Sequence, residues 1–169
     1  MVDLTNVPQH SIELKDLLNA SEIRTYMRKH NIRQYCYAFV YKSVVMKFGI
    51  QFKWCPTTFG ERAYRQAWHI PGWPNKPMST SGDDMLDVIK HFYGIHKNDV
   101  ILVIFDMTNY PRASSSNPDY EVKSLERQLI KHHIDSTGEP PAGNIKTEDH
   151  MDKKSIVIDD QFDNLFDPL

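Results

Sequence analysis

Two segments of the chain combine aromatic and β-branched residues at a density typical of strands. The first, "QYCYAFVYKSVVMKFGIQF" at residues 34–52, has Lys42-Ser43 near its middle, where a tight reversal would make a hairpin of 35–42 and 44–52. The second, "DVILVIFDM" at 99–107, is a continuous apolar run, which is typical of a buried strand. The pattern therefore predicts three strands.

Helical spacing of apolar residues accounts for much of the remaining chain. The segment "SEIRTYMRKHN" predicts a short helix over 21–31 capped by Ser21, and residues 10–20 give a weaker helical signal. The other predicted helices cover 60–70, 83–94 and 120–133. With three strands and helices to cover them, we expect an α+β fold with a small central three-stranded antiparallel sheet flanked by helices.

We expect one central domain with an extension at each end. Residues 1–33 are predicted to be an N-terminal helical extension, and 34–145 to be the functional domain. The last part, 146–169, is polar at first and then acidic, so we expect a flexible tail.

One polar residue interrupts the apolar face of the helix at 120–133. Val122, Leu125, Leu129 and Ile130 define that face, and Glu126 falls in its middle. An unpaired carboxylate in a core costs several kcal/mol or becomes protonated. Glu126 is therefore the first candidate for a functional residue.

Composition restricts the class of protein. A chain of 169 residues that is 40% hydrophobic can bury one sizeable core. There is no apolar run long enough to span a membrane, and the first residues lack the apolar region of a secretory signal. The chain has 2 cysteines, Cys36 and Cys55, in apolar or aromatic surroundings, so we expect reduced thiols and a cytoplasmic protein.

Charge is distributed unevenly along the chain. Residues 21–65 contain nine lysines and arginines against two glutamates, a local charge of +7. Such a region favours a phosphate-bearing partner, although an ordinary solvated basic face is an alternative.

The order of these features resembles the GIY-YIG nuclease family. Tyr37 stands at the family's first tyrosine position, and "KFG" at 47–49 stands where Tyr-Ile-Gly is expected. "RQAWH" supplies Arg65 and His69, and the helix and loop that follow supply Glu126 and Asn144. The second tyrosine is replaced by Lys47, as in some restriction enzymes of the family.

The resemblance implies a role for each matched residue. Tyr37 would be the general base and Lys47 would hold the phosphate, while Arg65 would clamp the non-bridging oxygens, with Arg62 as a rival for that role. His69 would assist proton transfer, and Asn144 would orient Glu126 or close the site. Substrate contacts are expected at Gly49, Arg62 and Lys53.

The expected activity is metal-dependent hydrolysis of DNA phosphodiester bonds. Glu126 would bind Mg²⁺ or Mn²⁺, because magnesium accepts one or two carboxylates together with phosphate and water. The alternative is a non-catalytic nucleic-acid-binding or replisome-docking module on the same scaffold, which the missing second tyrosine favours.

The C-terminal segment 158–169 places apolar residues at helical spacing among aspartates. Its candidate anchors are Phe162, Leu165, Phe166 and Leu169. The segment resembles the C-terminal clamp-binding peptides of T4-like phage replication proteins, which implies a DNA sliding clamp as partner and the cytoplasm of an infected host as location. The alternatives are a tail folded back on the domain and an acidic tail that covers the basic face.

Overall fold

The computed structural model describes residues 2–52, 59–74, 85–111, 120–144 and 160–166. Its centre is an antiparallel sheet of four strands in the order β1-β4-β2-β3, comprising β1 (Gln9–Glu13), β2 (Tyr35–Tyr41), β3 (Val44–Gln51) and β4 (Val100–Asp106). The α+β class is confirmed, and the prediction of three strands is wrong by one.

The additional strand comes from the N-terminal segment. Residues 10–20 do not form a helix, because Gln9–Glu13 pairs along β4 from Phe105 to Ile101. A weak apolar alternation in five residues carries little signal until a neighbouring strand supplies the backbone partners. The segment predicted as a helical extension thus contributes a strand to the sheet and Leu14 to the core.

The hairpin of β2 and β3 is confirmed. Its turn residues are Lys42 and Ser43, and both have positive φ, at 47° and 66°. This conformation matches the right-handed twist of the strands and is favourable for Asn-Gly, which explains why Lys-Ser was a weak sequence signal. The pairing of β2 with β3 shifts register between Phe39 and Val40, close to the turn.

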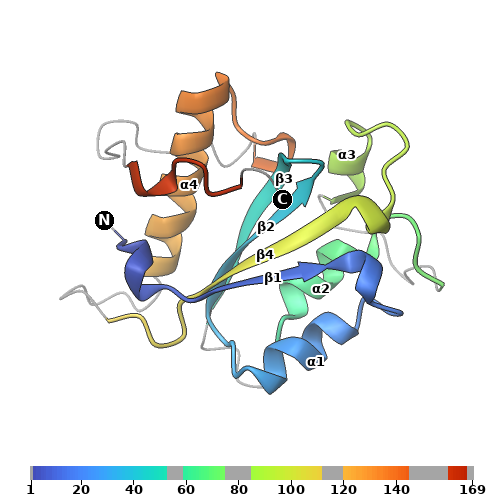
Figure 1. The fold of residues 1–169 in the computed structure, drawn as a ribbon, viewed down its shortest axis with the longest axis horizontal. Helices are drawn as coiled ribbons and strands as arrows, with labels where there is room; N and C mark the ends of the chain where they lie inside the picture. Colours follow the sequence, from blue (N-terminus) through green and yellow to red (C-terminus); the bar gives the residue numbers. More distant parts are fainter. Residues whose placement is uncertain (1, 53–58, 75–84, 112–119, 145–159, 167–169) are drawn as a thin grey trace.

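Helices cover both faces of the sheet (Figure 1). One face packs against α1 (Glu22–Lys29), α2 (Glu61–Trp68) and α3 (Met85–Ile89), and the other against α4 (Tyr120–Thr137). The helices predicted at 21–31, 60–70 and 120–133 are confirmed, although Ser21 makes no side-chain capping bond. The helix predicted over 83–94 is shorter, and residues 83 and 84 lie outside the described residues. Single 3-10 turns occupy Leu4–Asn6, Leu14–Asp16, Lys97–Asp99, Ala142–Asn144 and Asp160–Phe162.

Alternation along β2 separates the two cores. Tyr35, Tyr37 and Phe39 point to the α1–α2 side, and Cys36 and Ala38 to the α4 side. Cys36 is a free thiol whose pKa is raised well above its usual value, chiefly by burial. Cys55 lies outside the described residues. Of the helices that the structure describes, none combines the length and the hydrophobicity that a membrane span requires.

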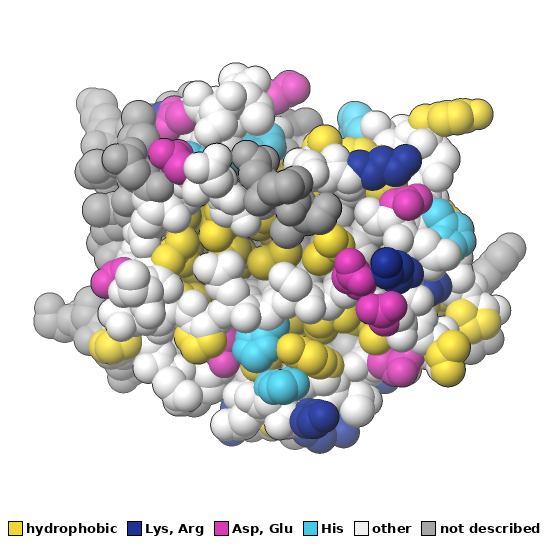
Figure 2. Space-filling view, viewed as in Figure 1, with side chains coloured by type: hydrophobic (Ala, Val, Ile, Leu, Met, Phe, Trp, Pro, Cys, Tyr) yellow, Lys and Arg dark blue, Asp and Glu magenta, His cyan; other side chains and the backbone are white. Residues whose placement is uncertain are grey.

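The described part of the C-terminal segment, Asp160–Phe166, folds back over the α4 side of the sheet (Figure 1). The Phe162 ring is buried, and the Phe166 ring lies 5.9 Å from that of Phe48. Gln161 joins the segment to the N-terminus by accepting from the Leu4 N–H and donating to the Val2 carbonyl. Figure 2 shows hydrophobic side chains gathered between this segment and β1. This arrangement is the folded-back alternative; residues 146–159 and Leu169 lie outside the described residues.

Candidate active site

Tyr37 and Gly49 face each other across the β2–β3 ladder. The phenol ring lies directly over the glycine, because a Cβ at position 49 would collide with its Cζ and hydroxyl atoms. The ring also contacts its strand neighbours, with centroids 5.9 Å from Tyr35 and 5.6 Å from Phe39. The Gly49 backbone can approach Tyr37 this closely only because position 49 has no side chain.

Lys47 lies on the same face of β3, two residues before Gly49. It pairs with Phe39, so it is a diagonal neighbour of Tyr37. Its side chain is 9% exposed, and its Nζ donates to the Gln66 Oε1 of α2 at 3.2 Å. Gly143 packs against the aliphatic stem, since a Cβ there would come within 3.0 Å of three carbons of Lys47. Lys47 is therefore a buried cation whose side chain is fixed by Gln66 and Gly143, and it does not face solvent.

Glu126 is half-buried on α4, as its place on the apolar helix face predicted. Burial raises its pKa from 4.5 to about 7, and the charges of Lys47, Arg127, Arg62 and Lys123 oppose that rise. Removal from water therefore outweighs four nearby cations. Glu126 in turn raises the pKa of Cys36 on β2, which places its carboxylate close to the sheet.

Lys47 and Glu126 approach from opposite faces of the sheet. Lys47 is on the α2 side and α4 covers the other side, yet their charges interact. Because β3 is the last strand of the sheet, its free edge is where the two sides meet. The candidate site thus lies at the edge of β3.

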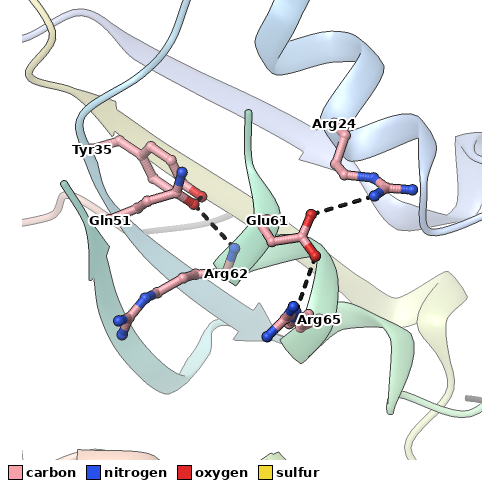
Figure 3. A network of polar contacts seen from close by, with 6 residues as sticks. All are labelled: Arg24, Tyr35, Gln51, Glu61, Arg62 and Arg65. Carbon is pink, nitrogen blue, oxygen red and sulfur yellow. Dashed lines mark hydrogen bonds and ion pairs between the residues drawn. The ribbon is translucent and has the colours of Figure 1, made fainter. Parts of the chain in front are cut away.

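The two candidate arginines of α2 have different surroundings (Figure 3). Arg65 donates from Nε to Glu61 at 3.0 Å, its side chain is 70% exposed, and Glu61 also pairs with Arg24. The Arg62 guanidinium points away from that cluster, and its charge lowers the pKa of Glu126. The charge of Arg62 therefore acts on Glu126, whereas Arg65 forms an ion pair with Glu61. Residues three apart on a helix point only about 60° apart and share one face, so a sequence match cannot choose between neighbours of this kind.

Asn144 pairs with the backbone of β3. Its Oδ1 accepts from the Phe48 N–H at 2.7 Å, and its Nδ2 donates to the Phe48 carbonyl at 2.9 Å. The amide thus satisfies both backbone groups of a buried edge residue, as a further strand would. It fixes the turn at Ala142–Asn144, and with it Gly143, against Lys47. This supports closure of the site, which was one of its two expected roles.

Two further residues, His69 and Lys53, were predicted to belong to the site. His69 is buried at the C-terminal cap of α2, where its N–H bonds to the Gln66 and Ala67 carbonyls. Lys53 lies outside the described residues.

Sequence reasoning missed two glutamines and one glycine. Gln51 accepts from the Tyr35 hydroxyl at 2.7 Å and from the Arg62 N–H at 3.1 Å, so it holds the start of α2 against the sheet. Gln66 and Gly143 hold Lys47. The only signal for Gln51 was a polar residue among the apolar ones of a strand, and Gln66 and Gly143 gave none.

No family model, curated protein or solved structure matches this chain. The geometry therefore carries the functional argument. A carboxylate and two cations interact around one sheet edge, and the buried Tyr37 phenol lies on the adjoining strand β2. Carboxylates, cations and phenols are groups suited to binding a phosphate ester and transferring a proton.

Proposed function

We propose that the chain is a metal-dependent endonuclease that hydrolyses phosphodiester bonds of DNA at a GIY-YIG-like site. One observation supports this above the others. Glu126 is a half-buried carboxylate whose pKa is raised to about 7 although Lys47 and Arg62 are near it. Such a group is stabilised by a cation of higher charge than the side chains provide.

Glu126 fits a magnesium or manganese ion in its donor chemistry. Among the described residues no group of three or more His, Cys, Asp or Glu side chains converges, so a cage made entirely of protein is not available there. Magnesium instead binds one or two carboxylates and completes its shell with phosphate oxygens and water. When bound, such an ion supplies positive charge at the phosphoryl oxygens.

The side chains around the β3 edge would bind the phosphate and accept the proton of water. Lys47 and Arg62 would bind the non-bridging phosphate oxygens, and the arginine fork suits that contact. Tyr37, as a phenolate favoured by the positive charge of Lys47, its diagonal neighbour, would accept the proton of the attacking water. Gly49 would contact the substrate through its backbone, because the space above it is occupied by the Tyr37 ring. Water would displace the 3′ or 5′ oxygen in one step, without a covalent enzyme intermediate.

Incubation with supercoiled plasmid tests this function. Wild-type protein should convert the plasmid to nicked or linear form with Mg²⁺ and leave it intact with EDTA. Glu126→Ala should remove the activity while the protein remains folded, as judged by circular dichroism. Cleavage by Glu126→Ala at the wild-type rate would overturn the site, and a wild-type protein that binds DNA without cutting it would support the non-catalytic module instead.

A further inference from the structure

A cavity of about 400 Å³ opens between α1 and α2, and the proposed catalytic groups do not line it. Its walls include Ser21 and Arg24 from the start of α1, Tyr64 and Trp68 from α2, and Trp73 from the loop after α2. The three aromatic side chains are only half-buried. A pocket that is built largely from partly exposed aromatic rings is a common form of ligand site.

The rings are held in place by specific contacts. Tyr64 and Trp68, one turn apart on α2, stack with centroids 5.3 Å apart and an angle of 28° between their planes. The Trp73 indole N–H donates to the Ala67 carbonyl at 2.8 Å, and the Lys97 ammonium lies 4.7 Å from the indole centroid. The aromatic walls are thus ordered before any ligand binds, which lowers the entropic cost of binding.

Arginines give the pocket a positive rim. The Arg24 guanidinium lies 4.1 Å from the centroid of the Tyr64 ring and 3.3 Å from Glu61. Glu61 also pairs with Arg65, so one carboxylate is shared by two arginines and a net positive charge remains (Figure 3). Both arginine side chains are at least 39% exposed, so they can reach an anion at the mouth of the pocket.

These features select one class of ligand. A flat aromatic ring stacks on Tyr and Trp whatever its hydrogen-bonding pattern, and arginine adds cation–π contact and attraction for phosphate. A quaternary ammonium ion, the other common ligand of aromatic cages, is disfavoured because Arg24 forms part of the wall and would repel it.

We propose that this pocket binds an unpaired nucleobase of a nucleic acid strand, with the adjoining phosphate against Arg24 and Arg65. The proposal rests on the proposed function insofar as the ligand is the same nucleic acid. The two sites share α2, because the charge of Arg62 acts on Glu126 while Tyr64 and Trp68 line the second pocket. A strand bound at both would be held on either side of one helix, and substrates with an unpaired base would be preferred over perfect duplex.

The test measures binding in EDTA, so that it does not depend on cleavage. Fluorescence anisotropy with a labelled single-stranded oligonucleotide should show about tenfold weaker binding for Trp68→Ala, in keeping with the loss of one base-stacking contact. Trp68→Phe should recover part of the affinity because a ring remains. Tyr93→Ala is the matched control, since Tyr93 is an exposed aromatic residue of another surface, and its affinity should be unchanged.

A second measurement needs no variant. An oligonucleotide that contains 2-aminopurine should lose fluorescence when wild-type protein binds, because stacking quenches that base, and an excess of choline should not restore it. Unchanged binding by Trp68→Ala, no quenching, or displacement by choline would each overturn the pocket assignment. Because binding is measured in EDTA and cleavage is measured with Mg²⁺, a failed cleavage assay and a failed pocket assay are separate results.

Discussion

At the scale of single residues, burial sets the properties of the candidate site. Glu126 keeps a raised pKa because four nearby cations do not compensate for its removal from water. Lys47 is held by Gln66 and by the close packing of Gly143, and Tyr37 lies in space that only Gly49 provides. Each of these side chains is useful in a catalytic site and unfavourable, or at best neutral, for a packed core.

The raised pKa of Glu126 predicts a specific pH dependence of stability. The folded protein binds this proton more tightly than the unfolded chain, so the contribution of Glu126 to stability is greatest below pH 4.5 and is lost as the pH rises to about 7. Glu126→Gln should therefore be more stable than wild type above pH 7, by up to about 3 kcal/mol, and the difference should vanish at low pH. Urea denaturation at pH 4.5 and pH 8 measures this, with Glu139→Gln, an exposed position, as control. The prediction is contradicted if the difference in stability between Glu126→Gln and wild type is the same at both pH values.

The arginines of α2 give a second prediction. Arg62→Ala should reduce plasmid cleavage by about 100-fold, as for the loss of one charge contact in a transition state, whereas Arg65→Ala should change it only a few-fold. The reason is that the charge of Arg62 acts on Glu126, and Arg65 pairs with Glu61. Initial cleavage rates of both variants decide the matter, and a larger effect of Arg65→Ala would restore the assignment made from sequence.

At the scale of elements, the edge strand β3 organises the site. It supplies Lys47 and Gly49 to one face, and its outer backbone at Phe48 is satisfied by the Asn144 side chain. Helix α2 closes the α1–α2 side and α4 the other side. Three elements thus meet at the outer edge of the sheet, which the turn Ala142–Asn144 covers at Phe48.

The conformation of the hairpin turn between β2 and β3 predicts a stabilising substitution. Lys42 and Ser43 both adopt positive φ, which costs energy for residues with side chains. Replacing the pair by Asn-Gly should stabilise the protein by about 1 kcal/mol, because these residues favour that turn. Thermal unfolding checks the shift, and replacement of the same pair by Ala-Ala, which does not favour positive φ, serves as a control that should not stabilise.

At the scale of the whole molecule, the two ends of the chain close one face of the sheet. Phe162 packs into the α4-side core together with Val2, and Gln161 bonds to the backbone at both Val2 and Leu4. His132 and Asp163 add a contact of 3.5 Å between α4 and the segment. Clamp docking through Phe162, Leu165 and Phe166 remains a proposal, and it would require these side chains to leave their own domain.

Because Phe162 is buried, we expect its replacement to reduce the free energy of unfolding. Phe162→Ala should destabilise the protein by about 3 kcal/mol, as for other buried phenylalanines, and Leu165→Ala by less, because Leu165 is only partly buried. Chemical denaturation measures both variants. If both are as stable as wild type, the segment does not pack on the domain in solution and is available to a partner such as a sliding clamp.

The sequence by itself determined the elements whose signals are local. The hairpin, the strand at 99–107 and the helices at 21–31, 60–70 and 120–133 follow from periodicity, and Glu126 was visible as a carboxylate on an apolar helix face. The hairpin turn alone would pair Tyr37 with Phe48, and only the register shift between Phe39 and Val40 pairs it with Gly49.

Only the tertiary structure decided which residues meet across large separations in the chain. The pairing of β1 with β4, the contact of Asn144 with Phe48 and the folding back of Phe162 each join segments with no shared local pattern. The choice of Arg62 over Arg65 likewise depended on how α2 is rotated against the sheet, which is set by the burial of Ala63 and Ala67 and by the Gln51 bond to the Arg62 N–H. Such choices are made by packing between elements, because local propensity is equal for the competing residues.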